Sequence, residues 1–165
     1  MQAISEEFSD YEFVIAGMSR FSEDFYRQFI TAGNVSIVFD QAYELLSKST
    51  ASITVSGTAT LETALLNIPQ VIVYKTNPLT FYIGKMLVNL KYLGLPNIIM
   101  EKEIVPELLQ SHMTAKNLRK ALHKVLDEKQ RATIFDSYKE LRQRLGEEGA
   151  AFRVARNIQK YLKKV

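Results

Sequence analysis

Short runs of β-branched and aromatic residues alternate with helical patterns along the first hundred residues of this chain. Such alternation is typical of parallel sheets whose strands are joined by crossover helices. The four clearest runs lie at residues 11–16, 35–39, 51–55 and 70–75. The sequence therefore predicts an α/β fold, with a Rossmann-like parallel sheet flanked by helices and a helical C-terminal tail.

The helices expected between these strands begin and end at characteristic residues. Ser22 is a favourable N-cap for a helix that would stop at Gly33, and Pro78 suits the start of a longer helix that would extend to Leu90. Two shorter helices are expected in addition, at residues 43–46 and 58–66. The apolar residues 98–100 are interpreted as a last short strand, after which the chain is expected to be helical.

Three apolar stripes at helical spacing occupy the C-terminal part of the chain, and each stripe is expected to be core or interface. They consist of Leu118, Leu122 and Val125, then of Ile134, Tyr138, Leu141 and Leu145, and finally of Phe152, Ala155, Ile158 and Leu162. We expect one domain, with an α/β core at residues 1–113 and a helical tail at residues 114–165.

The composition fits a single compact domain, because 165 residues with 47% hydrophobic content can bury a sizeable core. The net charge of +3 is unevenly distributed, since residues 116–165 hold 14 Lys and Arg against 6 Asp and Glu. These charges are dispersed over amphipathic helices without aromatic interleaving, so we expect a solvated surface and no nucleic-acid partner. Weak contact with anionic lipid head groups is the alternative.

The chain contains no cysteine, which excludes disulfides and thiolate metal sites. Its first residues lack the pattern of a signal peptide, and no uncharged apolar run approaches the roughly 20 residues of a membrane span. We therefore expect a cytoplasmic protein.

A candidate ligand site lies where the strand at residues 51–55 runs into Ser56-Gly57 and directly into a helix. Gly57 would let the backbone approach a ligand closely, and the free amides of the first helical turn favour a phosphate there. Ser56, Thr58 and Thr60 add hydroxyl groups at the carboxyl end of a strand, where open α/β sheets bind ligands. The segment lacks the further glycines or lysine of nucleotide-binding motifs, so a plain capped turn is the alternative.

Glu62 lies within the first turns of the same helix. Its carboxylate could accept hydrogen bonds from both hydroxyls of a nucleotide ribose, or it could be a surface residue that complements the helix dipole. A reciprocal capping box does not fit, because residue 59 is Ala rather than Ser or Thr. The pattern alone leaves both interpretations open.

Several segments occur together in one order and spacing: Ser56-Gly57-Thr58-Ala59-Thr60-Leu61-Glu62, Pro69, Val71–Tyr74, Pro78–Phe81, Leu95-Pro96-Asn97 and Glu103–Gln110. In this arrangement the chain resembles the lipid-A-disaccharide synthase family of GT-B glycosyltransferases, strongly from about residue 51 to residue 110 and more weakly elsewhere. The Gly-x-x-x-x-Glu helix followed by Pro is shared with other GT-B enzymes, whereas the combined run is highly specific.

The resemblance implies a transferase that moves a diacylglucosamine unit from UDP-2,3-diacylglucosamine to 2,3-diacylglucosamine 1-phosphate, without a cofactor or an essential metal. It places Gly57, Thr58, Ala59 and Thr60, together with Ser56, at the UDP diphosphate, and Glu62 at the ribose. It places Asn97 in a loop near the sugar donor or the reacting centre, with a simple turn residue as the alternative. His112 and His123 lack a carboxylate cluster and are expected to be surface residues rather than metal ligands.

The sequence also departs from the family pattern, which begins this domain with a strand that leads into a Pro-Gly-Ser-Arg loop. That motif does not occur here. The arginine that would offset the diphosphate charge and the N-terminal acceptor domain are therefore expected to be absent, and the chain alone is expected to be inactive. No general base is identified, since Asp10, Asp40 and Glu44 are interpreted as loop or helix-cap residues.

Two further expectations concern partners. The apolar residues 81–92 are interpreted as a core helix, with contact to lipid acyl chains as the alternative. The resemblance also implies a homodimer and peripheral contact at the inner face of the inner membrane. The competing functions are another GT-B UDP-sugar enzyme and a non-catalytic nucleotide-sugar-binding module.

Overall fold

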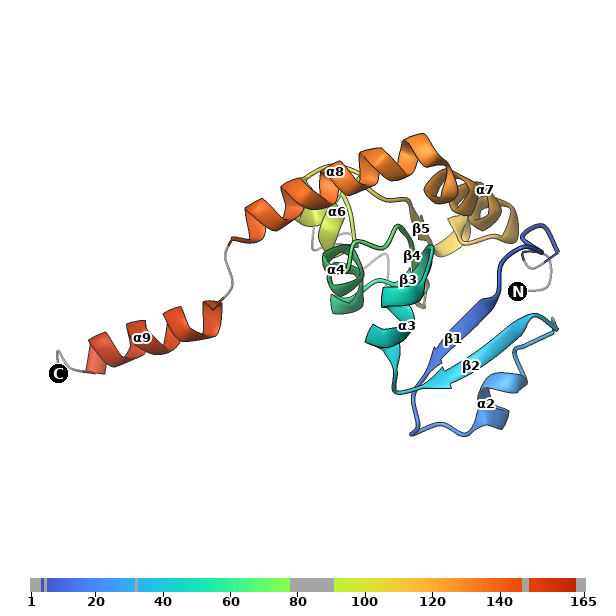
Figure 1. The fold of residues 1–165 in the computed structure, drawn as a ribbon, viewed down its shortest axis with the longest axis horizontal. Coiled ribbons are helices and arrows are strands. Elements are labelled where there is room, and N and C mark those ends of the chain that lie inside the picture. The colour runs from blue at the N-terminus through green and yellow to red at the C-terminus, as the bar shows by residue number, and fades with distance from the viewer. Residues whose placement is uncertain (1–3, 5, 32, 78–90, 147–148, 163–165) are drawn as a thin grey trace.

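The computed structural model describes residues 4, 6–31, 33–77, 91–146 and 149–162, and it has the predicted α/β architecture (Figure 1). The described elements are, in chain order, β1 (Phe13–Gly17), α2 (Glu23–Arg27), β2 (Val35–Phe39), α3 (Ala42–Lys48), β3 (Ser52–Val55), α4 (Thr58–Leu65), β4 (Gln70–Tyr74), α6 (Leu95–Met100), β5 (Glu107–Leu109), the 3-10 helix η1 (Gln110–His112), α7 (Ala115–Leu126), α8 (Glu128–Leu145) and α9 (Ala150–Leu162). The helix expected from Pro78 to Leu90, and with it most of the apolar segment 81–92, lies outside the described residues.

All described strand pairs are parallel, as predicted, but the strands are divided between two sheets. In the first sheet β1 pairs with β2, and Phe13 lies opposite Val35. In the second sheet β4 is central, with β3 on one side and β5 on the other. β1 and β3 are therefore each paired along one edge only within the described part of the chain.

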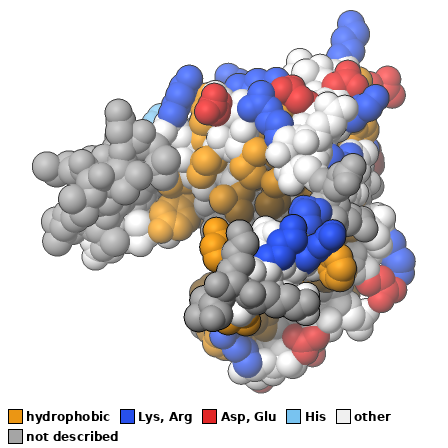
Figure 2. All heavy atoms as spheres, turned by 90° about the vertical axis from the view of Figure 1, so that its left-hand side faces the viewer, with side chains coloured by type: hydrophobic (Ala, Val, Ile, Leu, Met, Phe, Trp, Pro, Cys, Tyr) orange, Lys and Arg blue, Asp and Glu red, His pale blue; other side chains and the backbone are white. Residues whose placement is uncertain are grey.

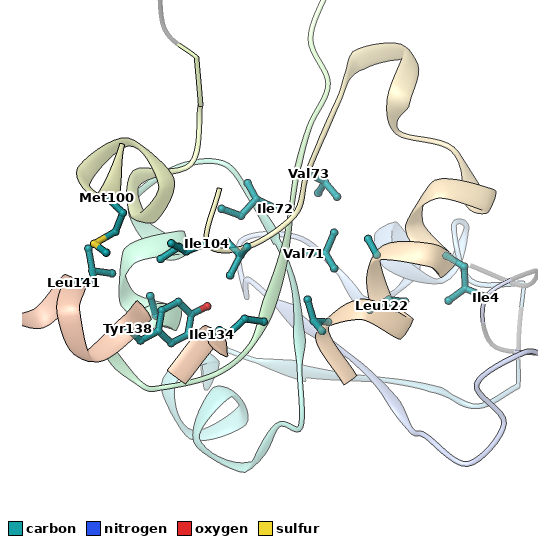
Figure 3. Close-up of a cluster of buried hydrophobic side chains, with 14 of the residues drawn as sticks. Ile4, Val71, Ile72, Val73, Met100, Ile104, Leu122, Ile134, Tyr138 and Leu141 are labelled. Carbon is teal, nitrogen blue, oxygen red and sulfur yellow. The ribbon is translucent and has the colours of Figure 1, made fainter. Parts of the chain in front are cut away.

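The hydrophobic core is built around β4, whose residues alternate between two packed sides as strand geometry requires. Ile72 points to the side on which Met100, Tyr138 and Leu141 lie, while Val71 and Val73 point to the side of Leu122 and Ile4 (Figure 3). The core thus draws on α6 and α8 on one side of the sheet and on α7 and the N-terminal segment on the other. Burial on both sides explains the continuous apolar run of β4.

The helix boundaries follow from specific capping residues. The Ser22 side chain accepts a hydrogen bond from the Phe25 amide and caps α2, as predicted, although α2 ends at Arg27 instead of Gly33. Helix α4 ends next to Asn67, which has a left-handed φ of 65°. That conformation terminates many helices and is accessible to Asn.

The prediction of a strand at residues 98–100 is wrong. These residues belong to α6, which follows Gly94 and has Pro96 in its first turn, where a missing amide costs nothing. A short apolar run is compatible with either a strand or a buried helix, and sequence periodicity does not separate the two. The last strand is instead β5, in a segment that was expected to be helical.

The described residues after 113 form the helices α7, α8 and α9, and two of these helices pack into the core. Helices α7 and α8 contribute Ala121, Leu122, Val125, Ile134, Tyr138 and Leu141 to the core. Among the described helices, α9 lies away from the body, and Gly146, which follows α8, has a φ of 79° (Figure 1).

The apolar stripe of helix α9 is exposed to solvent. Phe152 is 72% exposed and Leu162 is equally exposed, so this stripe, which was expected to be core or interface, is not core in this structure. Figure 2 views the molecule from the side of α9 and shows hydrophobic side chains exposed near Lys and Arg side chains.

Candidate functional site

The expected strand-turn-helix site is present between β3 and α4. Gly57 occupies the N-cap position of α4 with φ 158° and ψ −167°, a backbone region that is essentially restricted to glycine. A Cβ atom at Gly57 would meet the Val55 carbonyl oxygen at 4.0 Å, an ordinary van der Waals contact, so the backbone angles rather than crowding favour the glycine. Gly57, Thr58 and Ala59 are exposed, and the amides of a first helical turn lack intrahelical acceptors. The turn is therefore open to an anionic ligand.

Two of the three expected hydroxyl groups are engaged within the protein. The Thr60 side chain is fully buried and donates to the Gly57 carbonyl oxygen at 2.7 Å. The Ser56 hydroxyl donates to the Leu93 carbonyl oxygen at 2.8 Å. Both hydroxyls fix the shape of the turn in this structure, and the exposed Thr58 remains the hydroxyl best placed to reach a ligand.

Glu62 lies on α4, next to α3. Its Oε2 accepts a hydrogen bond from the Tyr43 hydroxyl at 2.8 Å, and this bond, together with the negative charge of Glu62, raises the pKa of Tyr43. The Tyr43 contact gives the carboxylate a preferred orientation at the open side of the helix. Sequence reasoning missed this pair, because the two residues are 19 positions apart and belong to different helices.

Asn97 does not lie in a loop, as the sequence had suggested, and this expectation is corrected by the structure. It belongs to α6, its side chain is fully buried, and it makes four hydrogen bonds inside the protein. Its Nδ2 donates to the Val105 carbonyl and to Glu107 Oε1, both at 2.8 Å, while its Oδ1 accepts from the amides of Ile104 and Val105. These bonds use the full capacity of the amide group. In this structure Asn97 is a scaffold residue.

Glu107, which sequence analysis did not single out, connects Asn97 to the candidate site. Its carboxylate also accepts from the amides of Leu93 and Gly94, at 2.9 and 3.0 Å. Because the Leu93 carbonyl accepts from Ser56, one chain of hydrogen bonds runs from Asn97 through Glu107 to the β3–α4 turn. Gly94 is required here, since an added Cβ would lie 2.2 Å from Ile72 Cδ1.

The other acidic and imidazole side chains named from the sequence lie in different elements of the fold. Asp40 follows β2 and accepts from the Ser19 amide, and hydrogen bonding to Ser19 lowers the pKa of Asp40. Glu44 forms an i,i+4 ion pair with Lys48 in α3. His123 Nε2 lies 2.6 Å from Glu7 Oε1. Asp10 lies in a turn, and His112 lies in η1.

A family model described as lipid-A-disaccharide synthetase matches residues 1–160. This chain belongs to the lipid-A-disaccharide synthase family. The match includes the β3–α4 turn, Glu62 and the Asn97–Glu107 network.

Curated lipid-A-disaccharide synthases from several bacteria are similar to this chain. The Geobacter sulfurreducens enzyme is 33% identical over 161 residues, which are 93% of this chain and 41% of that enzyme. The Sulfurihydrogenibium enzyme is 43% identical over 124 residues, which are 74% of this chain and 32% of that enzyme. The Synechocystis enzyme is 40% identical over 131 residues, covering 76% and 33% of the two chains. This member of the family spans about a third to two-fifths of the length of these relatives.

Among the residues that the structure describes, no group of three or more His, Cys, Asp or Glu side chains is arranged to hold a metal ion. None of the described helices is both long enough and apolar enough to cross a membrane.

Proposed function

We propose that this chain forms the UDP-sugar-binding half of a lipid-A-disaccharide synthase. The observation that carries the proposal is the Gly57 turn, which places the exposed residues Gly57, Thr58 and Ala59 at the start of α4, next to the carboxyl end of β3. A helix N-terminus with free amides and a positive dipole end favours a phosphate group. The proposed UDP contacts are Ser56, Gly57, Thr58, Ala59 and Thr60 at the diphosphate, with Ser56 and Thr60 shaping the turn.

The ribose of UDP is proposed to bind at Glu62. Its carboxylate is one turn further along α4 than the proposed phosphate position, and Tyr43 holds one of its oxygens. A carboxylate that accepts bonds from two hydroxyls forms charge-assisted hydrogen bonds, which are stronger than neutral ones. Asn97 is proposed to act on the donor indirectly, by fixing Glu107 and the Leu93–Gly94 connection.

The complete reaction is proposed for the longer enzyme in which this region occurs. There, a 2,3-diacylglucosamine unit would pass from UDP to 2,3-diacylglucosamine 1-phosphate, and no cofactor or metal would be required. The chain alone is proposed to bind the nucleotide sugar without turning it over. A homodimer and a peripheral membrane contact are proposed to use the exposed apolar stripe of α9.

Substitution Glu62→Gln is expected to weaken UDP binding about tenfold or more, because an amide cannot form the same charge-assisted bonds with the ribose. Isothermal titration of the chain with UDP and with 2′-deoxy-UDP measures this effect. The preference for UDP over 2′-deoxy-UDP should decrease in the variant, while the melting temperature should change little.

Glu44→Gln is the matched control, because Glu44 is an exposed carboxylate on the neighbouring helix α3. This substitution should leave the affinity for UDP unchanged. Absence of UDP binding by the parent chain would contradict the proposed function. An intact preference for UDP over 2′-deoxy-UDP in Glu62→Gln would show that Glu62 does not bind the ribose.

A further inference from the structure

The Tyr43 side chain is exposed, although its hydroxyl is held by a neighbouring helix. Tyr43 is the second residue of α3 and is 62% exposed. Its hydroxyl donates to Glu62 Oε2 at 2.8 Å, which fixes the outer end of the ring against α4. Within the part of the chain that the structure describes, no aromatic ring or cationic side chain is stacked on Tyr43. The ring is therefore oriented and still available for contact with a ligand.

The backbone that carries Tyr43 is fixed at the carboxyl ends of β1 and β2. Asp40, the first residue after β2, has a left-handed φ of 54° and turns the chain toward α3. Its amide donates to the Gly17 carbonyl at 3.0 Å, and its carboxylate accepts from the Ser19 amide at 3.1 Å. Open α/β sheets bind ligands beyond the carboxyl ends of their strands. Tyr43 follows such an edge, and its bond to Glu62 joins that edge to α4, which lies beside α3 (Figure 1).

The proposed position of the ribose brings the base of the nucleotide close to this ring. A carboxylate has lone pairs for about four hydrogen bonds, so Glu62 can accept from the Tyr43 hydroxyl and from both ribose hydroxyls. In a nucleotide, the base is attached to the sugar carbon next to the 2′-hydroxyl, whereas the phosphates are attached beyond the 3′-hydroxyl. With the diphosphate at the Gly57 turn, the base therefore leaves the ribose on the side away from that turn. The Tyr43 ring, which is bonded to the same carboxylate, then lies within reach of the base.

We infer that the ring of Tyr43 is the surface on which the base of the nucleotide stacks. This inference rests on the proposed function, because it takes the ribose position at Glu62 as its starting point. Stacking of a base on an aromatic side chain typically changes affinity by about tenfold or more. The bond from Glu62 orients the Tyr43 ring before the ligand binds, so less conformational freedom is lost on binding. Glu62 thus serves both the ribose and the residue that holds the base.

The test compares UDP with dihydro-UDP, in which the uracil is reduced to dihydrouracil. Dihydrouracil keeps the carbonyl and imide groups of uracil, but its ring is puckered and not aromatic, so it stacks poorly. In isothermal titration, the parent chain should bind UDP about tenfold more tightly than dihydro-UDP. Tyr43→Leu removes the aromatic ring and should bind the two ligands equally. Tyr43→Phe keeps the ring and should retain most of the preference for UDP.

Phe29→Leu is the matched control, because Phe29 is an aromatic residue with the same exposure of 62% and follows α2, outside the candidate site. This variant should keep the full preference for UDP over dihydro-UDP. A preference that persists in Tyr43→Leu, or that Phe29→Leu loses to the same extent, overturns this inference and leaves the proposed function intact. So does a parent chain that binds both ligands equally. A parent chain that does not bind UDP overturns the proposed function, and this inference with it.

A measurement on the parent chain decides the question even if circular dichroism shows that Tyr43→Leu does not fold. In NMR spectra of the complex with UDP, the ring protons of uracil should show nuclear Overhauser contacts with the ring protons of Tyr43. The uracil signals should also move upfield, because protons above an aromatic face are shielded by its ring current. Overhauser contacts with a different aromatic residue, or with none, overturn the inference.

Discussion

Substitution Asn97→Ala is expected to lower the free energy of unfolding by about 3 to 5 kcal/mol, because a small apolar side chain would leave several buried polar groups without partners. The amides of Ile104 and Val105 and the Val105 carbonyl would each lose a hydrogen bond, and so would Glu107. Urea denaturation followed by circular dichroism measures the effect as a shift of the midpoint at a constant slope.

Asn117→Ala is the matched control for this prediction. Asn117 is a partly exposed residue of α7 whose Nδ2 donates to the His112 carbonyl in a solvent-exposed hydrogen bond, which water can replace. Its loss should cost less than about 1 kcal/mol. Similar effects of the two substitutions would mean that the Asn97 network is not formed in solution.

The buried hydrogen bonds of Asn97 also change how the Leu95-Pro96-Asn97 segment of the family resemblance is interpreted. An asparagine in such a specific run had suggested contact with the sugar donor, yet its hydrogen-bonding capacity is already filled by the protein. The network instead leads through Glu107 and Leu93 to Ser56. Asn97 therefore connects the packing of α6 with the shape of the β3–α4 turn, which links fold stability to the candidate site.

The sequence correctly predicted the elements whose propensities and capping residues agree with the tertiary structure around them. The strand at residues 35–39 and the Ser22 cap are confirmed, because β-branched residues and a serine N-cap act through neighbouring atoms. Helix α6 was mistaken for a strand, since it contains only six residues and its Ile-Ile-Met run fits either structure. The short β5 was missed because its pairing with β4 depends on residues more than thirty positions away.

The candidate site shows the same division between local and long-range information. The direct strand-to-helix turn at Gly57 was predicted from neighbouring residues, and the structure has it, with Gly57 at the N-cap of α4. The Tyr43–Glu62 bond and the capping of the Leu93–Gly94 amides by Glu107 could not be predicted, because each joins separate elements. The division of the strands between two sheets was also unpredictable, since an amphipathic pattern does not identify a strand's neighbours.

Substitution Leu141→Ala is expected to destabilise the chain by about 2 to 5 kcal/mol, the usual range for removing a fully buried leucine. Leu141 is completely buried in α8 and lies next to Met100 of α6 (Figure 3). Arg142, the next residue, donates to the Leu65 carbonyl at the end of α4, so α8 is fixed to two other helices of the fold.

The control for this prediction is Leu145→Ala, one turn later in the same helix. The Leu145 side chain is 40% exposed, so this substitution should lower the free energy of unfolding by only roughly 0.5 kcal/mol. Thermal and urea unfolding of both variants distinguish a core helix from a detachable one. A detachable α8 would give small and similar effects at both positions. A large effect confined to Leu141, with a single cooperative transition in both variants, would show that α8 and the α/β core unfold together. The separable part of the chain would then begin only after Leu145, at the glycine turn that leads into α9.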